Sequence, residues 1–367
     1  MPNVQPPAST VQLQQQPAQR VLIIGPSNIG DAILAGDVIA AAHARFPDAH
    51  LTLVVGARAM AVFADDPRVN TLVNADAFDT VAGRLRLALA LWRFHPSVVI
   101  DLRHTLYPLL LAPARAWRYL RQPPPQVRHM RDRQLWKWHW QAPRAGGRRT
   151  AEAPVGSALC ETPRDTAHVE TLCRRWHLRP GAPLVVVCPG ARSHLKRWTA
   201  EGMARVADGL IRDAGADVVF SGEPDEEAIV QGILGMMEKP AHSAVGLTTI
   251  RQVGGLMRRA HLVITNDSAS LHLASAVGVP TLAIFGPTDP AKYGPRAPRQ
   301  RTIHRRLFCA PCEQAQCRFT HECMRFVSAE EVYRAAVDLL GQGAARPGAR
   351  HRQAGGNVGR GKNKHAR

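Results

Sequence analysis

One polar turn in the second half of the chain has the residue types that bind an anion. Residues 266–272 read NDSASLH and follow a β-branched apolar run at 262–265. The first N–H groups of a helix have no partner within it, so a helix that begins at such a turn favours an anion. The same letters also fit an ordinary N-capped helix with a buried histidine. The candidate phosphate site and its neighbour are Asp267, Ser268, Ala269, Ser270 and His272.

A second polar turn presents a carboxylate. Residues 25–31, GPSNIGD, follow the apolar run at 21–24. The two glycines are typical of a phosphate-binding loop, but Asp31 stands where such a loop has its lysine, and a carboxylate would repel phosphate. The turn also lacks G-x-G-x-x-G, so neither a nucleotide hydrolase nor a dehydrogenase is favoured. Asp31 is better suited to accept a proton or a hydroxyl hydrogen bond, with partnership to the helix dipole as the alternative role.

The elements that must position these turns alternate between strand and helix. Gly278 and Pro280 end the helix that begins at the NDSASLH turn, and the turn at 286–290 follows the next strand. The alternation is typical of two doubly wound α/β halves with a cleft between them, and ligands bind outside the carboxyl ends of such strands. The expected strands are 21–24, 51–55, 98–101, 184–188, 218–220, 262–265 and 281–285, and the expected helices are 32–46, 81–94, 199–212 and 271–277.

Composition limits the class of protein. A chain of 367 residues with 45% apolar content predicts two domains, each able to bury a core. No run approaches the roughly 18 to 20 apolar residues of a membrane span, and the first twenty residues lack the apolar centre of a secretory signal, so we expect a cytoplasmic protein. The seven cysteines fit free thiols or a metal site better than a secreted disulfide framework.

The net charge of +18 is concentrated in two segments. Residues 343–367 carry seven Lys/Arg and no acid, and residues 115–149 carry ten Lys/Arg against Asp132 alone. The remaining chain is close to neutral, so no specific nucleic-acid partner is expected, and the tail reads as disordered by composition. The central segment suits an anionic membrane surface, although base stacking would use the same residues. Its interleaved aromatic residues are Trp117, Tyr119, Trp136, Trp138 and Trp140.

Four motifs, in order and spacing, give the chain a resemblance to a known family. Residues 21–35, 188–198, 266–272 and 285–290 resemble the ADP-heptose:lipopolysaccharide heptosyltransferases of glycosyltransferase family 9, over about residues 20–340. The resemblance implies a GT-B fold of two Rossmann-like domains. It also implies an inverting transfer from ADP-L-glycero-D-manno-heptose that requires no metal or cofactor. The implied acceptor is the lipid A–core at the inner face of the inner membrane, where the enzyme would be peripheral.

The resemblance also implies roles for individual residues. Asp31 matches the catalytic base, and Lys196 and the helix start at 268–270 would hold the leaving diphosphate. Asp267 matches the donor-site Asp, which we interpret as holding sugar hydroxyls. Glu223 or Glu226 would bind the ribose, with a helix-capping acid as the equal alternative. The remaining expected contacts are Leu247 and Thr248 for the adenine and Ser27, Asn28 and Gly30 for the acceptor side.

The expected domains are an N-terminal extension at 1–19, an acceptor domain at 20–175, a donor domain at 176–342 and a basic tail at 343–367. One residue departs from the family pattern, because Ala269 stands where Gly is common. Its methyl group would crowd a phosphate or resist a positive φ.

Four cysteines near the end of the donor domain form a compact cluster. Cys309, Cys312, Cys317 and Cys323, with His321 between the last two, could enclose a structural zinc, although the spacing is not that of a standard finger. Reduced thiols or disulfides are an equal alternative, and a redox role is a third.

Two other functions remain open at this stage. One is a transferase that uses a different sugar nucleotide. The other is a catalytically weakened protein that binds anionic lipid or nucleic acid. The sequence does not decide between Kdo and an attached heptose as acceptor, although residues 25–27 and 188–191 are closer to the second heptosyltransferase than to the first. It does not predict an oligomeric state.

Overall fold

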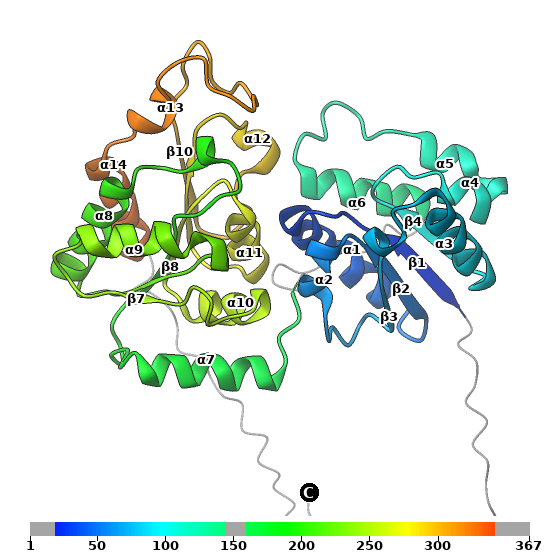
Figure 1. Ribbon diagram of the computed structural model, residues 1–367, viewed down its shortest axis with the longest axis horizontal. Helices are drawn as coiled ribbons and strands as arrows, with labels where there is room; N and C mark the ends of the chain where they lie inside the picture. The colour runs from blue at the N-terminus through cyan, green and yellow to red at the C-terminus, as the bar shows by residue number, and fades with distance from the viewer. Residues whose placement is uncertain (1–18, 144–158, 342–367) are drawn as a thin grey trace, which may run out of the picture.

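The computed structural model describes residues 19–143 and 159–341. Two parallel sheets, each covered by helices, lie side by side (Figure 1). The predicted extension at 1–19 lies, apart from its last residue, outside the described residues, as do the basic tail at 343–367 and the segment 144–158.

The first half contains a four-stranded sheet in the order β3-β2-β1-β4. Strand β1 lies at the centre of this sheet and pairs with β2 and β4. The turn after β1 therefore lies at the middle of the edge where the strands end. The elements, with η for 3-10 helices, are β1 (Arg20–Ile24), α1 (Ile29–Arg45), β2 (His50–Val55), α2 (Ala57–Phe63), β3 (Thr71–Asn74), η1 (Ala75–Phe78), α3 (Val81–Arg93), β4 (Val98–Asp101), α4 (Tyr107–Leu111), η2 (Pro113–Arg115), α5 (Ala116–Leu120) and α6 (Met130–Gln141).

The second half contains a six-stranded sheet in the order β10-β9-β8-β5-β6-β7. Strands β5 and β8 are neighbours at its centre, so the turns that follow them are adjacent. The elements are α7 (Pro163–Arg175), β5 (Leu184–Cys188), η3 (His194–Lys196), α8 (Ala200–Ala214), β6 (Asp217–Phe220), η4 (Pro224–Glu226), α9 (Glu227–Met236), β7 (His242–Ser243), α10 (Ile250–Arg259), β8 (Leu262–Asn266), α11 (Ala269–Val277), β9 (Thr281–Phe285), α12 (Pro290–Tyr293), β10 (Gln300–His304), α13 (Glu322–Arg325) and α14 (Ala329–Gly341).

The predicted α/β alternation is confirmed. Each predicted strand is present within one residue of its expected bounds, and each predicted helix within three. Gly278 ends α11 in the left-handed conformation with φ 74°, as its position after the helix predicts. The division at residue 175 stays a prediction, and α7, which precedes it, packs against α10 of the second half.

The interpretation of the central aromatic segment as an interface is wrong for two of its members. Tyr119 and Trp138 are buried, because α5 and α6 turn them into the core of the first half. Trp136 and Trp140 are half-buried and stack with ring centroids 5.6 Å apart. Within the described residues, no helix is long and apolar enough to cross a membrane.

Candidate active site

Two helix starts meet where the halves face each other. Helix α1 follows β1, and helix α11 follows β8. A Cβ atom on Gly30 would lie 3.0 Å from the ring of His272 and 3.7 Å from the Cα of Ala269, so the first turns of the two helices are nearly in contact. A side chain at position 30 would be tight there and would require the neighbouring atoms to shift by a few tenths of an ångström. Both polar turns predicted from the sequence therefore belong to one site.

Asp31 lies in the first turn of α1 and faces the second half. Burial raises the pKa of its carboxyl, while a hydrogen bond with Asn28 and the positive charge of Lys196 partly lower it. A carboxylate with a raised pKa is a stronger base than an exposed one, which suits a group that removes a proton.

Lys196 carries the positive charge of the site. Its ammonium lies 2.7 Å from Oδ2 of Asp267, at the carboxyl end of β8, and 5.9 Å from the ring centre of Tyr293. The Asp267 side chain is 5% exposed, whereas that of Lys196 is 33% exposed. An ammonium has three donors, so Lys196 can bond Asp267 and still present N–H groups to an anion.

The turn that holds Lys196 is fixed from two directions. The amide of Asn266 donates to the carbonyl of Pro189 at 2.6 Å and accepts from the backbone of Trp198 at 3.2 Å. From the other side, the His321 imidazole donates to the carbonyl of Leu195. These bonds attach the turn to the end of β8 and to the cysteine-containing loop, and so fix the backbone that carries Lys196.

The start of α11 has the features of an anion site. Ser268 is its N-cap and makes no side-chain capping bond, although its hydroxyl lies 3.5 Å from that of Thr265. The Ser270 hydroxyl forms a hydrogen bond with the Cys188 thiol. Ala269 is the first helical residue and does not have a positive φ, so that part of the objection to its methyl group does not apply. The first N–H groups of α11 therefore point at the site without a side-chain cap.

His272 is a buried, uncharged member of the site. Burial lowers its pKa to about 4, although Asp267 acts in the opposite direction. Its ring packs against Tyr293 with centroids 6.3 Å apart. At neutral pH, His272 is thus uncharged, so its ring lies between the two helix starts without adding a positive charge.

The two candidate ribose acids are in different situations. Glu226 accepts a hydrogen bond from the backbone of Glu223 at 2.9 Å, and its carboxylate lies against Gly190 and Gly222 at the ends of β5 and β6. Burial raises its pKa. Glu223 instead pairs with Arg58 of the first half at 3.3 Å, with both side chains about half exposed. Position favours Glu226 for a nucleotide contact, although its bond to Glu223 also fits a capping role.

The predicted adenine residues follow β7 of the second half, and the predicted acceptor residues follow β1 of the first half. Leu247 accepts from His168 through its carbonyl, and Thr248 bonds the carbonyl of Ala244, both in the segment after β7. On the other side, Asn28 is exposed and accepts from Arg192 at 3.3 Å. The hydroxyl of Ser27 is buried and has no hydrogen-bond partner among the described residues.

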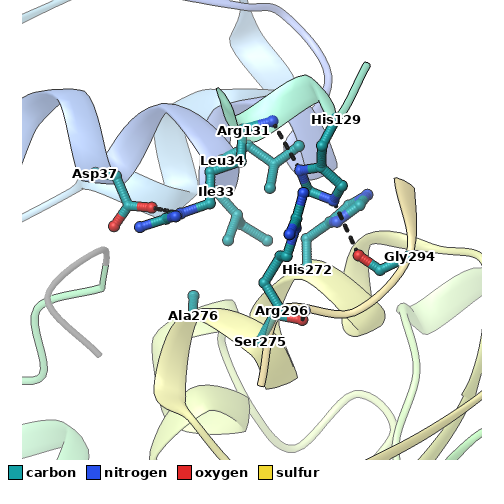
Figure 2. A pocket seen from close by; sticks show the side chains of 10 residues that line it. All are labelled: Ile33, Leu34, Asp37, His129, Arg131, His272, Ser275, Ala276, Gly294 and Arg296. Atoms are coloured by element: carbon teal, nitrogen blue, oxygen red, sulfur yellow. Dashed lines mark hydrogen bonds and ion pairs between the residues drawn. The ribbon is translucent and has the colours of Figure 1, made fainter. Parts of the chain in front are cut away.

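A small polar joint lies beside the site (Figure 2). The His129 ring, which precedes α6, donates to the carbonyl of Gly294 at 2.9 Å. Burial lowers the pKa of His129, and its Nδ1 accepts from the backbone N–H of Arg131 at 3.3 Å, which leaves Nε2 as the donor. Arg131 pairs with Asp37 of α1 behind it. The joint holds α1 and α6 of the first half against the second half.

The structural zinc proposed for the cysteines is not supported. In the ranges that the structure describes, no three His, Cys, Asp or Glu side chains converge so that they could hold a metal ion. Cys309, Cys312, Cys317 and Cys323 are free thiols that line the wall of a cavity of about 290 Å³ with Phe319, rather than surrounding one point. Burial, together with the other three thiols, raises the pKa of Cys323 to about 11. This arrangement agrees with the reduced-thiol alternative.

Sequence reasoning missed several members of the site. Tyr293 reaches Lys196 from α12, Arg192 contacts Asn28 across the cleft, and Asn266 supports the Lys196 turn. Tyr293 stands a few residues after the turn at 286–290, and that position after a strand end is the one signal that could have found it.

The two facing α/β halves have the GT-B fold, which is also the fold of solved heptosyltransferases. Residues 151–322 match the model of glycosyltransferase family 9 (heptosyltransferase). This match spans a little under half of the chain, and several relatives of the chain are named lipopolysaccharide heptosyltransferases.

Individual relatives show how far this similarity extends. The lipooligosaccharide heptosyltransferase 2 of Campylobacter jejuni is 31% identical over 44% of this chain and 53% of its own length. The lipopolysaccharide heptosyltransferase 2 of Escherichia coli K12 is 25% identical over 77% of this chain and 87% of its own. The chain therefore spans only about half the length of the Campylobacter relative. The solved E. coli ADP-heptose LPS heptosyltransferase II has a TM-score of 0.69 at 20% identity, covering 89% of this chain and all of that one, which establishes the fold.

Proposed function

We propose that this chain is an inverting, metal-independent heptosyltransferase that uses ADP-L-glycero-D-manno-heptose. The observation that carries the proposal is the arrangement of three groups. A basic carboxylate, Asp31, comes from one half, and the Lys196–Asp267 pair and the uncapped start of α11 come from the other. A sugar placed between them would have a base on one side and an anion site on the other.

The proposed reaction is a single displacement. Asp31 accepts the proton of an acceptor hydroxyl as that oxygen forms a bond to the anomeric carbon of the donor sugar. The bond between this carbon and the diphosphate oxygen breaks on the opposite face, which inverts the configuration and releases ADP. The charge that develops on the diphosphate is stabilised by the Lys196 ammonium and by the N–H groups of α11.

The donor contacts follow from the same placement. Asp267, held by Lys196 at the end of β8, would bind sugar hydroxyls. Glu226 would accept from the ribose, and Leu247 and Thr248 would contact the adenine. These residues lie in the segments after β6, β7 and β8, on the edge where α/β sheets bind nucleotides.

We further propose that the acceptor is a heptose already attached to the lipopolysaccharide core. Several relatives are named heptosyltransferase 2, including those of Campylobacter jejuni and Haemophilus influenzae. Ser27, Asn28 and Gly30 border the acceptor side of Asp31 and would receive this sugar. Because such an acceptor is anchored in a membrane, we propose that the enzyme works in the cytoplasm as a peripheral protein at the inner face.

A product assay tests this function. The full chain is incubated with ADP-heptose and with two truncated lipopolysaccharides, one ending in Kdo and one ending in the first heptose, and products are measured by mass spectrometry. We expect one added heptose on the second acceptor. Transfer only to Kdo would overturn the acceptor assignment, and transfer only from another sugar nucleotide would overturn the donor assignment. No transfer from any sugar nucleotide would remove the enzymatic proposal.

A further inference from the structure

One end of the first half exposes an unusual amount of apolar surface. Of the fifteen large hydrophobic side chains that are exposed in the described residues, nine lie between residues 81 and 120. They belong to α3, α4 and α5 and the adjoining loops, which lie together at the end of this half farthest from the second half (Figure 1). We call these exposed apolar side chains of residues 81–120 the α3–α5 face.

Helix α3 shows that this exposure follows a pattern. Leu87 and Leu91 point into the core, as an amphipathic helix requires. Val81, Leu85 and Trp92, at helical spacing along a different stripe, are exposed by 77%, 66% and 54%. A helix that is apolar on a second stripe is normally covered on that stripe as well. Nothing within the described chain covers it.

Most charges around the α3–α5 face are positive. Residues 80–121 contain seven arginines and one acid, Asp101. That carboxylate is buried and accepts hydrogen bonds from the backbone of Arg103 and Thr105, so it adds no exposed negative charge. The nearest exposed acid, Asp79, pairs with Arg84 at 3.1 Å. The face therefore combines apolar side chains with an excess of guanidinium groups.

This combination matches the surface of a bilayer that contains anionic lipid. Aliphatic and Trp side chains enter the boundary between headgroups and acyl chains, while arginines remain at the phosphates. Nucleic acid fits less well, because bases stack on aromatic rings, and most of the large exposed side chains here are leucines, with Leu106 and Leu120 exposed by 75% and 70%. We propose that the α3–α5 face docks the enzyme on an anionic bilayer.

The docking surface extends the proposed function, and its role in catalysis rests on that function. The face belongs to the half that carries Asp31, so docking would place the half that is proposed to receive the acceptor against the membrane that holds it. Binding itself is measurable without any substrate.

The test compares charge-preserving variants in vesicle sedimentation. The full chain is mixed with phosphatidylcholine vesicles with and without phosphatidylglycerol. We expect binding to the anionic vesicles and a loss of about tenfold or more in the triple variant Leu85→Ser, Leu106→Ser, Leu120→Ser. All charges, including those of the basic tail, stay in place in this variant. The matched control is Met236→Ser with Val337→Ser, exposed apolar residues of the second half, which should bind like the parent.

Three results would overturn the proposal. The triple variant could bind as well as the parent, which would leave the charges as the sole cause of binding. The parent could fail to bind anionic vesicles. The parent could self-associate in solution and become monomeric in the triple variant, which would make the face an interface between copies. Circular dichroism melting confirms folding, and activity on a water-soluble deacylated acceptor should be unchanged by the triple change. Vesicle binding without any heptose transfer would remove the proposed function and leave the docking surface.

Discussion

At the scale of single residues, the site depends on three charged groups whose positions are mutually fixed. Asp267 is almost fully buried and is bonded by Lys196, and the charge of Lys196 also acts on Asp31. A change in one of them should therefore alter the behaviour of the others. This coupling separates a working site from an ordinary surface ion pair.

The pH dependence of kcat/KM should show the environment of Asp31. A base acts only when ionised, so activity should rise with pH through the pKa of this carboxyl. Burial raises that pKa above its ordinary value of about 3.9, so the acid limb should lie at higher pH than for an exposed Asp. Lys196→Ala should move the limb higher still, because it removes a cation that lowers the pKa. A limb that does not move in Lys196→Ala would contradict the coupling.

Lys196→Ala should also weaken the binding of ADP. A hydrogen bond to a charged group contributes about 1.5 to 3 kcal/mol, which corresponds to about 10- to 100-fold in Kd by titration calorimetry. Lys292→Ala is the matched control, since that lysine pairs with the exposed Glu313 at 2.7 Å on the surface. Equal affinity for ADP in the two variants would show that Lys196 does not contact the diphosphate.

At the scale of elements, the close approach of α1 and α11 makes the site sensitive to the size of residue 30. Gly30→Ala would place a methyl group 3.0 Å from His272, so the two helix starts must separate by a few tenths of an ångström. We expect kcat to fall by about tenfold, because small misplacements of reacting groups are costly. Gly232→Ala on α9, where a Cβ would meet nothing within 4 Å, should leave kcat unchanged. Full activity in Gly30→Ala would show that the helices need not be this close.

The elements also show how much was predictable from the sequence. Strands such as 184–188 and helix α11 have apolar runs bounded by clear turn residues, and their positions were predicted nearly to the residue. Strands β3, β7 and β10 were missed, because all three lie at sheet edges, are only partly buried and carry no continuous apolar run. Asp267 could be found because it directly follows its strand, and Asp31 because it lies at the helix start after the polar turn that follows β1. For Tyr293 the sequence offered only its position after a strand end, because its contact with Lys196 depends on where α12 lies in the folded chain.

The cysteines show a different limit of sequence reasoning. Their spacing in the sequence is compatible with a metal site, but spacing does not determine where the side chains point. In the structure, Cys317 is exposed and Cys323 is buried, and the thiols border a cavity. The loop instead reaches the active site through His321 and the Leu195 carbonyl, a contact that only the folded chain brings together.

At the scale of the whole molecule, the two halves are joined by polar contacts around the cleft. Arg128 pairs with Asp289 at 2.7 Å, and Arg296 pairs with Asp132 at 2.8 Å. Such partly exposed ion pairs contribute at most about 1 kcal/mol each to the free energy of unfolding. They therefore affect the relative position of the two halves more than the stability of the protein. The basic groups that the sequence concentrated in 115–149 thus serve in part to join the halves.

The most direct test of the account is a single-turnover measurement with Asp31→Asn, which keeps the size of the side chain and removes its basicity. With ADP-heptose and the heptose-terminated acceptor, we expect the rate of transfer to fall by about a hundredfold or more, while the affinity for the donor stays within about twofold of the parent. A variant that transfers heptose at the parent's rate would contradict the assignment of Asp31 as the base.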